Sequence, residues 1–311
     1  MERRQAALYV LSIVAGAFIG LVLPGLASPA QLLITPCLMA LLYATFLAIP
    51  FAEVAHAFRG WRFLVAILVL NFVAGPAVVW LLTRPLDHDP ALLVGALFVL
   101  LCPCVDYVIV FAGLAGGDSK RMLAATPLLM GSQMLLLPFY LWLFAGPSVV
   151  RAVEFGPFLE AFVLFIVVPL AAAILTQGAA KRSEAVQDWE EAVAAAMVPL
   201  MMATLAVVVA SQIDKVSAEA GRLWTVVPIF VSFAVVMLLV TLAVSRGVRM
   251  DTAGTRALVF SAITRNSLVV LPLVLALPAQ FALAPLVVVT QTLVELVLMV
   301  ILVRALPRWV K

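Results

Sequence analysis

Two apolar stretches of the chain contain residues that rarely lie in hydrocarbon. The first, ALFVLLCPCVDYVIV at 96–110, contains Cys102, Pro103, Cys104 and Asp106. A thiolate suits a soft, thiol-seeking ligand, and a carboxylate can carry a proton. A charge at the centre of a bilayer costs about 2.5–3.5 kcal/mol even on insertion scales, so intramembrane acids are usually functional. We therefore expect Asp106 to couple protons or to gate a ligand, Cys104 to bind the ligand, and Cys102 and Pro103 to be secondary candidates.

The second stretch, ALVFSAITRNSLVVL at 257–271, can be aligned with the first, and polar residues interrupt it at the matching place. These residues are Thr264, Arg265, Asn266 and Ser267. Arg265 is the natural partner of Asp106, and a permanent pair between them would be structural, because only a pair that breaks could titrate. Alternatively, Arg265 holds an anionic ligand with the help of helix N-termini. We expect Arg265, Asn266 and Ser267 to bind the ligand, with Thr264 as a secondary candidate.

Further polar residues lie inside other apolar runs. They are Asn71, Ser132, Gln133 and Glu295. Glu295 lies in TQTLVELVLM at 290–299, whose polar residues can share one helix face, so it is the second candidate proton carrier. Ser132 and Gln133 are secondary candidates for lining a cavity. Asn71 is a weaker candidate, because its setting favours helix packing and a backbone hydrogen bond over ligand contact.

The chain shows no motif of an enzyme or of a cofactor site. Its two histidines and three cysteines lack the spacing of metal ligands, and no Gly-rich phosphate loop is present. Neither histidine lies within an apolar run, so a serine, histidine and acid triad is not expected inside the membrane. We expect no metal, no cofactor and no catalytic activity.

The amino-acid composition indicates whether these residues belong to a soluble protein or to a membrane protein. The chain is 66% hydrophobic and 11% charged with a mean hydropathy of +1.21, whereas soluble domains are about 25% charged. Its basic residues fall in ones and twos between apolar runs, which is not the pattern of a nucleic-acid-binding face. The composition predicts an all-α integral membrane protein that contacts the lipid bilayer and binds no nucleic acid.

Apolar runs of roughly 17–25 residues are long enough to cross the hydrocarbon core. Ten such runs lie near 7–26, 31–50, 61–82, 90–114, 122–146, 157–178, 192–211, 222–245, 255–277 and 281–304. With ten spans, most lysines and arginines fall on one side, and Arg265 is the basic residue that lies deep within a span. We therefore predict a multi-pass protein of the cell membrane with both termini in the cytoplasm.

The longest polar stretch divides the spans five and five. It begins at 181, and its apolar residues recur at helical spacing, so we expect a cytoplasmic surface connector over 181–191. Residues 1–150 then form the first five-helix repeat, 151–180 the sixth helix, and 192–311 the remainder of the second repeat. An odd number of spans in each half predicts inverted repeats, with broken fourth and ninth helices that cross at the midplane.

Several short motifs resemble those of a known family. They are LNFVAGP at 70–76, Pro103 and Cys104 followed by Gly117 and Asp118, and LVELVLM at 293–299. In this order they resemble the bile acid/sodium symporter superfamily, and more closely its arsenical-resistance branch of arsenite efflux permeases. The resemblance extends over nearly the whole chain and places Glu295 on a glutamate of that branch.

The chain departs from the family pattern at two places. The arsenical-resistance branch carries an Asn-Asn-Phe-Glu stretch in the ninth span, where this chain has Arg265, Asn266, Ser267 and Leu268. Sodium-coupled members carry a Ser-Asn pair where Val108 and Ile109 stand here, and a hard cation needs several oxygen ligands. The sodium ligands of that kind are therefore missing.

The resemblance implies a secondary active transporter that moves arsenite or a related metalloid oxyanion outward, driven by protons. A single thiol at the broken helix would bind trivalent arsenic weakly enough to release it. An organic-anion transporter with Arg265 as the anion clamp is the alternative within transport. A non-transporting membrane sensor or assembly subunit is the alternative from another class. The oligomeric state is left open.

Overall fold

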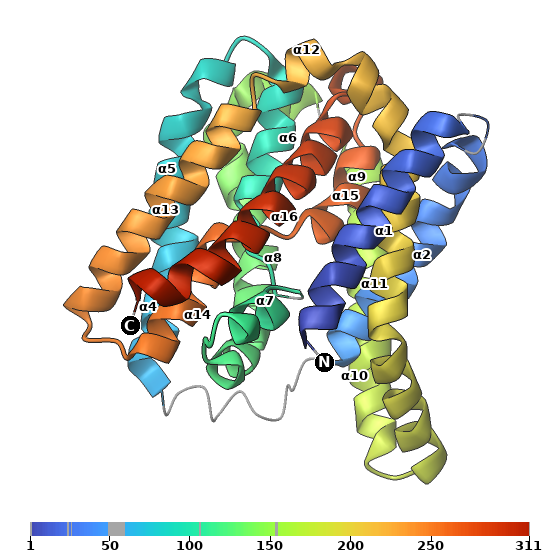
Figure 1. Cartoon of the computed structure of the whole chain (residues 1–311). Coiled ribbons are helices and arrows are strands. Elements are labelled where there is room, and N and C mark those ends of the chain that lie inside the picture. The colour runs from blue at the N-terminus through green and yellow to red at the C-terminus, as the bar shows by residue number, and fades with distance from the viewer. Residues whose placement is uncertain are drawn as a thin grey trace.

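The computed structural model describes residues 2–23, 25, 27–48, 60–105, 107–152 and 155–310, so Asp106 lies outside the described residues. In this part of the chain every regular element is a helix (Figure 1). In chain order the elements are α1 (Glu2–Val22), α2 (Ala27–Leu47), α4 (Trp61–Val69), π-helical η4 (Leu70–Ala74), α5 (Gly75–Thr83), 3-10 helix η5 (Arg84–Leu86), α6 (Pro90–Leu100), α7 (Val108–Leu114), α8 (Ser119–Ala152), α9 (Phe155–Phe162), π-helical η6 (Val163–Val167), α10 (Val168–Ala180), α11 (Glu184–Ala218), α12 (Ala220–Leu223), α13 (Val227–Gly247), α14 (Thr252–Ile263), α15 (Ser267–Leu275), 3-10 helix η7 (Ala279–Phe281) and α16 (Ala284–Trp309).

The helices have the length and surface of a membrane protein. Seven of those described are long and apolar enough to span a bilayer, and two shorter apolar helices are Leu11–Val22 and Pro90–Leu100. Large apolar side chains point outward on several of them, with Leu32, Leu135 and Leu175 exposed by 78%, 79% and 73%. Water would make such a surface costly, so it faces lipid. These features agree with the predicted all-α membrane protein.

The predicted spans absent from these seven are the first, the fourth and the ninth. The first contains the shorter apolar helix Leu11–Val22, and the other two are each divided into two helices. α6 ends at Leu100 and α7 begins at Val108, while α14 ends at Ile263 and α15 begins at Ser267. The chain therefore leaves the helical conformation at the two places where the sequence carries Pro103 and the polar residues from Thr264 to Ser267.

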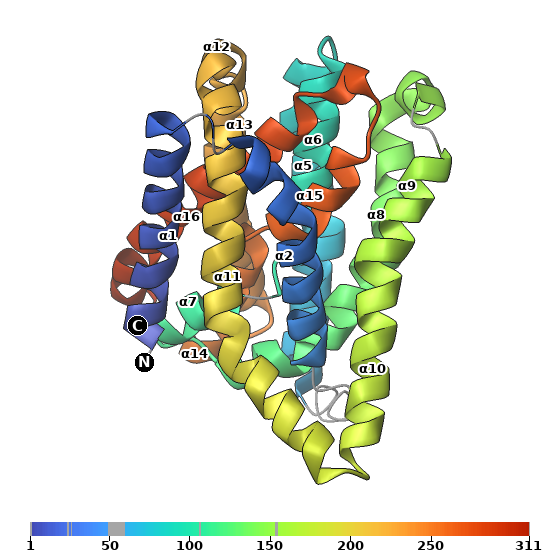
Figure 2. The same ribbon diagram turned by 90° about the vertical axis from the view of Figure 1, so that its right-hand side faces the viewer.

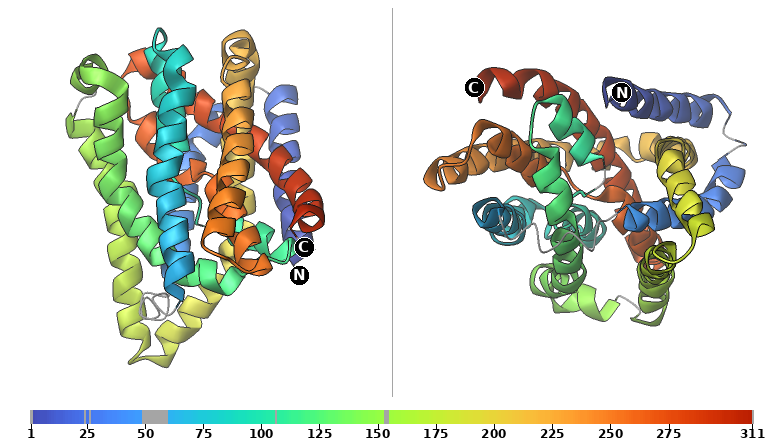
Figure 3. Two further views of the ribbon diagram at one scale, coloured as in Figure 1. Left: turned by 90° about the vertical axis from the view of Figure 1, so that its left-hand side faces the viewer. Right: turned by 90° about the horizontal axis from the view of Figure 1, so that it is seen from below.

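One group of helices consists of α1, α2, α10 and α11, which pack on one another (Figures 2 and 3). Gly16 and Gly20 of α1 lie against α11, where a Cβ on either would come within 2.5 Å of the carbonyl oxygen of Ala206 or Ala210. Small residues spaced by four positions on both helices allow this close approach of the backbones. At these positions the backbones of α1 and α11 therefore pack directly against each other, with no large side chain between them.

A second group of helices packs around α16. In Figure 1 α16 runs obliquely across the molecule and packs against α6, α13 and α15. A Cβ on Gly95 of α6 would lie 2.8 Å from the carbonyl oxygen of Ala284, so glycine permits the contact between α6 and α16. This packing brings the C-terminal helix alongside the interrupted helices.

Most of the predicted connector, 181–191, lies in the first turns of α11. α11 begins at Glu184 and continues as one helix to Ala218, so that only a short turn separates it from α10. The sequence from 184 to 198 contains no proline or glycine, and its alanine, glutamate and valine residues do not break a helix. The hairpin of α10 and α11 extends beyond the other helices, and both chain termini lie toward that same end of the molecule (Figure 2).

Candidate functional site

Two segments that have left the helical conformation, 101–105 and 264–266, pair with each other; we call this pair the crossing. The Cys104 N–H donates to the Thr264 carbonyl at 3.2 Å, and the Asn266 N–H donates to the Cys102 carbonyl at 2.7 Å. Pro103 and Arg265 face each other in this antiparallel bridge, at the position that exchanges no hydrogen bonds. Proline has no N–H to donate, so this position costs it nothing. The pairing satisfies backbone groups that hydrocarbon would leave unpaired.

The carboxylate of Glu295 on α16 joins the second segment of the crossing to Tyr107, at the start of α7. Its Oε2 accepts the backbone N–H of Arg265 at 2.7 Å and the Gln291 Nε2–H at 2.6 Å. Its Oε1 accepts the Tyr107 hydroxyl at 2.5 Å. The Arg265 N–H points away from the bridge and needs an acceptor, which Glu295 supplies. A carboxylate that is 2% exposed therefore receives three donors from three elements.

The Arg265 side chain lies among α13, α14 and η4. Its Nη1 donates to Asn71 Oδ1 at 3.2 Å and its Nη2 donates to the Ala262 carbonyl. The guanidinium carbon lies 4.6 Å from the ring centroid of Phe233, a cation–π contact. The side chain is fully buried, and among the described residues no carboxylate lies within 4.0 Å of the guanidinium. The predicted partner, Asp106, is outside the described residues.

Asn71 holds the guanidinium rather than lining an open cavity. It lies in the π-helical turn η4, and its Nδ2 donates to the Ile67 carbonyl and to Ser261 Oγ, each at 3.0 Å. Its Oδ1 is then left to accept from Arg265. Its hydrogen bond to the Ile67 carbonyl is a backbone hydrogen bond of the kind expected from the sequence. The contact with Arg265 is an additional, polar role of Asn71.

The thiols of Cys102 and Cys104 are both buried at the crossing, with exposures of 1% and 0%. Cys102 lines a cavity of about 10 Å³ together with Gln133 of α8, Phe162 and Val269. Gln133 is also buried, and its Nε2 contacts the Met130 sulfur at 3.1 Å. Ser132, its neighbour, is half-buried. The structure therefore brings Cys102 and Gln133 to one cavity.

Several polar atoms at the crossing have no hydrogen-bond partner in the described part of the chain. They are Arg265 Nε, Asn266 Nδ2, Ser267 Oγ and Gln291 Oε1. Other polar atoms of the second segment are satisfied, because Asn266 Oδ1 caps α15 at the Val269 N–H and Thr264 Oγ1 donates to the Phe260 carbonyl. Buried polar atoms without partners are rare in native proteins, so water or a ligand is expected to contact these atoms.

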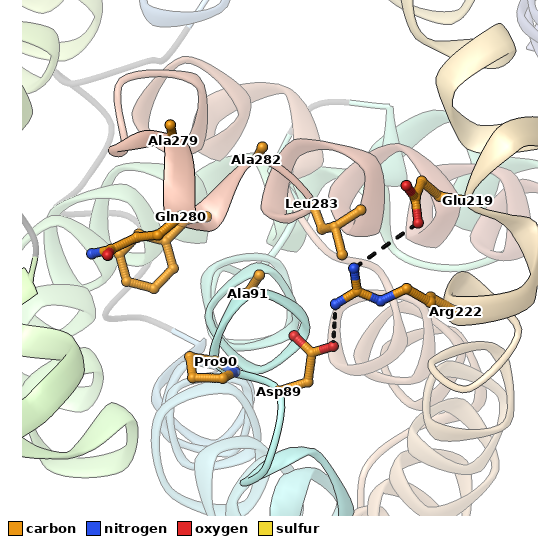
Figure 4. Close-up of a pocket in the computed structure, with 10 residues that line it drawn as sticks. Asp89, Pro90, Ala91, Glu219, Arg222, Ala279, Gln280, Ala282 and Leu283 are labelled. Atoms are coloured by element: carbon orange, nitrogen blue, oxygen red, sulfur yellow. Dashed lines mark hydrogen bonds and ion pairs between the residues drawn. The ribbon is translucent and has the colours of Figure 1, made fainter.

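A cavity of about 470 Å³ lies at the start of α6, far from the crossing (Figure 4). α12, which borders it, lies at the opposite end of the molecule from both termini in Figure 1. α6 has 11 residues, so the cavity and the crossing are roughly 16 Å apart. Arg222 lines this cavity and contacts Asp89 at 2.5 Å and Glu219 at 4.0 Å. The cavity is lined by apolar residues as well as by these three charged side chains, and it is separate from the crossing.

Asp89, which lines this cavity, contacts both α6 and Arg222. It caps α6 by accepting the Leu92 N–H at 3.3 Å, directly before Pro90 at the first helical position. Burial acts to raise the pKa of Asp89, but the hydrogen bonds from Arg222 and Leu92 outweigh it, so the pKa lies below its ordinary value of 3.8. Asp89 followed by Pro90 is a helix-start signal in the sequence, although Asp89 was not predicted as a site residue.

The motif residues Gly117 and Asp118 lie away from the crossing. Asp118 pairs with Arg121 at 3.0 Å, and Arg121 also pairs with Asp251 at 2.7 Å. Gly116, in the same turn, has a φ of 70°, which glycine adopts without strain. These contacts tie the turn between α7 and α8 to the turn between α13 and α14, which is a structural role.

Two residues that contact Glu295 were not predicted as site residues. Tyr107 follows Asp106 directly, and Gln291 precedes Glu295 by one helical turn. The one-turn spacing was a readable signal for Gln291. Nothing in the sequence pairs Tyr107 with Glu295, because 188 positions separate them.

The chain matches the model of a known protein family. A profile of the Sodium Bile acid symporter family matches residues 35–219, which is more than half of the chain. A comparison with curated proteins found no match. The matched region includes the first segment of the crossing and ends at the C-cap of α11, before Arg265 and Glu295.

Proposed function

Because the chain belongs to the sodium bile acid symporter family, a family of membrane transporters, we propose that it is a secondary active transporter whose solute binds at the crossing. The observation that carries this proposal is the antiparallel bridge between Pro103 and Arg265. Four helix ends meet there, and interrupted helices at membrane depth are found where a cavity or a binding site needs them. These residues do not form a catalytic group of a known type, so we propose transport as the activity.

We further propose that the solute is arsenite or a related metalloid oxyanion, as in the arsenical-resistance branch. Trivalent arsenic is a soft centre that prefers sulfur ligands. Cys102 and Cys104 place two thiols within the first segment of the crossing, on either side of Pro103. The sequence motifs of the branch at Pro103, Cys104 and Glu295 support the same substrate class.

The proposed driving force is a proton gradient, with Glu295 as the coupling group and Asp106 as the further candidate. Glu295 accepts hydrogen bonds from Tyr107 and from the Arg265 backbone, so it touches both sides of the crossing. A protonated carboxyl group has one fewer acceptor position and gains a donor, which loosens this contact. Each coupled charge supplies about 2.3 kcal/mol per 100 mV, enough for a roughly 50-fold solute gradient.

The proposed topology is ten spans in two inverted five-helix repeats, with both termini in the cytoplasm. α1, α2, α4–α5, α6–α7 and α8 would form the first repeat, and α9–α10, α11, α12–α13, α14–α15 and α16 the second. The support is that the interrupted helices occupy the fourth place in both sets. The proposed location is the cell membrane.

Uptake of arsenite into everted membrane vesicles tests the function. Vesicles with the chain should accumulate arsenite when a proton gradient, inside acidic, is imposed, and should not respond to a sodium gradient. Vesicles prepared without the chain are the control. Absence of arsenite flux from vesicles that contain folded protein would overturn the substrate proposal, and absence of flux for every solute tested would favour a sensor or an assembly subunit.

A second candidate solute is an organic anion held by Arg265. It is favoured by one observation, the buried guanidinium with no carboxylate within 4.0 Å among the described residues. Arg265→Gln should then abolish uptake of an anionic bile acid such as taurocholate while leaving the protein folded. If the wild-type chain does not move taurocholate at all, this candidate is excluded.

A further inference from the structure

We propose that the ion pair between Arg222 and Asp89 is a latch that holds the two helix groups together on the face opposite the chain termini. Opening of the latch gives the solute access to the crossing. This inference goes beyond the transport function proposed above but rests on it. Arg222 is then a positioning residue, because it lies at the start of α6 and not at the crossing.

The crossing lies at the boundary between the two helix groups. A cavity of about 10 Å³ is lined by Cys102 and Val269 on one side and by Ile166 of η6, which continues directly into α10 of the first group, on the other. A second cavity of about 10 Å³ lies between Ser267 of α15 and Val208 of α11. Both groups therefore contribute walls next to the crossing, and we call this boundary the seam.

The seam is closed in this structure. Cys102 and Ser267 are each 1% exposed, and a cavity of about 10 Å³ holds roughly one water molecule. The Ser267 hydroxyl has no hydrogen-bond partner among the described residues, so a buried polar atom borders the seam. A solute larger than water therefore needs the two groups to move apart before it can reach the crossing through the seam.

The short helix α12 connects the two groups on the face opposite the termini. It follows α11 of the first group directly and leads into α13, which packs against α16 in the second group. α12 has four residues, and helices this short gain little stability from their own hydrogen bonds. Hinges form at such element-terminal positions. A movement between the groups on this face can therefore take place at α12.

Arg222 on α12 lies between one carboxylate from each group (Figure 4). Its guanidinium contacts Asp89, which caps α6 in the second group, at 2.5 Å. It also contacts Glu219, at the end of α11 in the first group, at 4.0 Å. α6 leads from Asp89 to the first segment of the crossing. The pair with Asp89 therefore ties the link between the groups to the helix that positions Cys102.

The surroundings of this ion pair allow it to open. Arg222 is 53% exposed, and solvent-exposed ion pairs contribute little to stability, so this contact can break and form again in each cycle. The cavity of about 470 Å³ beside it is lined by residues of α6, α12 and η7. The guanidinium and α12 can move into this space without displacing packed side chains. A weak contact next to open space is what a gate requires.

A similar arginine lies near the end of the molecule that carries both termini (Figure 1). Arg121 contacts Asp118, three residues before it, at 3.0 Å and Asp251, the N-cap of α14, at 2.7 Å. It is 40% exposed, so it resembles Arg222 in exposure and in its two acidic partners. The helices that it joins, α8 and α14, do not belong to the first group. Breaking this pair should leave the seam closed, which makes Arg121 the matched control.

The reaction of the buried thiols with a membrane-impermeant sulfonated maleimide measures how often the seam is open. The parent for this test is the full chain with Cys37→Ala, in which Cys102 and Cys104 are the reporters, in vesicles of both orientations. Protease digestion of a C-terminal tag identifies the face that each preparation exposes.

Arg222→Gln and Asp89→Asn should each raise the labelling rate about twofold to fivefold from the face opposite the termini, because loss of an exposed ion pair shifts the open population by about that factor. Asparagine still caps a helix, so Asp89→Asn removes the charge and keeps the start of α6. Arg121→Gln should be labelled as slowly as the parent.

The double variant Asp89→Asn with Arg222→Gln tests whether the two charges act as a pair. It should be labelled no faster than either single variant, because each single change already breaks the contact. Three results would overturn the latch. They are an Arg222→Gln rate equal to that of the parent, an equal increase in Arg121→Gln, and an increase from both faces, which indicates general loosening of the fold.

Arsenite uptake separates this inference from the proposed function. If the latch variants are labelled faster from the expected face but vesicles of the wild-type chain move no arsenite, the solute proposal fails and the latch stands. If wild-type vesicles take up arsenite but Arg222→Gln leaves the labelling rate unchanged, the latch fails and transport stands.

Discussion

Glu295 accepts the backbone N–H of Arg265 at 2.7 Å, although Glu295 lies in α16 and Arg265 lies between α14 and α15. A segment that leaves its helix exposes an N–H, and in hydrocarbon an unsatisfied N–H costs several kcal/mol. The carboxylate removes that cost and at the same time accepts from Tyr107 of the other interrupted stretch. One ionisable group therefore stabilises the pairing of both segments, which makes its protonation a means of changing the crossing.

Tyr107→Phe should weaken this contact without removing the carboxylate. A hydrogen bond to a charged group contributes about 1.5–3 kcal/mol, so we expect a lower melting temperature of the purified protein and a shifted pH profile of arsenite uptake. Tyr43→Phe is the control, because Tyr43 bonds to Thr176 of α10 and lies in the other helix group. If Tyr107→Phe and Tyr43→Phe have the same pH profile, the hydroxyl has no part in coupling.

Asp89→Asn should remove a contribution to stability that depends on pH. The pKa of Asp89 lies below its ordinary value of 3.8, because the Arg222 and Leu92 hydrogen bonds outweigh burial. For an acid with a lowered pKa, the stabilisation is complete above the unfolded value and disappears as the pH falls through the folded value. Wild type should therefore melt higher than the variant at pH 7, and the difference should disappear as the pH falls below 3.8 and through the lowered pKa of the folded state.

The effect at Asp89 should be small and sensitive to salt, because Arg222 is 53% exposed and solvent screens the pair. Asp87→Asn is the matched control, since Asp87 lies two positions before Asp89 and pairs with the exposed Arg84, three positions before it. A difference between Asp89→Asn and wild type that grows as the pH falls would contradict the assignment.

Gly16→Ala should separate α1 from α11. A Cβ at this position would lie 2.5 Å from the Ala206 carbonyl oxygen, a contact that the backbone must relieve by moving. Overpacking of this kind costs about 1–3 kcal/mol. Gly178→Ala in α10 meets nothing within 4 Å and should be neutral or stabilising by about 0.4–1 kcal/mol. Thermal melting of both variants checks this, and equal melting temperatures would show that α1 and α11 do not approach closely.

The interruptions of the fourth and ninth spans were predictable from the sequence, because Pro103 and the polar run from Thr264 to Ser267 are local features. Glu295 was predictable as a candidate for the same reason, since an acid stands out in an apolar run. The membrane class followed from composition. These predictions needed only residue type and position along the chain.

The partners of these residues were not predictable in the same way. Asp106, the expected partner of Arg265, lies outside the described residues, and the pair stays a prediction. The described contacts of Arg265 are Asn71, Ala262 and Phe233, which come together through packing of α13, α14 and η4. The ion pair of Asp89 with Arg222 joins residues 133 positions apart. Such contacts depend on how the helices pack, and the spacing of apolar residues along the sequence does not show which helices pack together.

The central claim is that protons drive a solute through the crossing by way of Glu295. The most direct measurement is the initial rate of arsenite uptake into everted vesicles under an imposed proton gradient, for wild type, Glu295→Gln and the exposed control Glu160→Gln. We predict that wild type and Glu160→Gln respond to the gradient, and that Glu295→Gln loses the response while retaining exchange of labelled for unlabelled arsenite. A Glu295→Gln chain that still accumulates arsenite in response to the gradient would contradict the account.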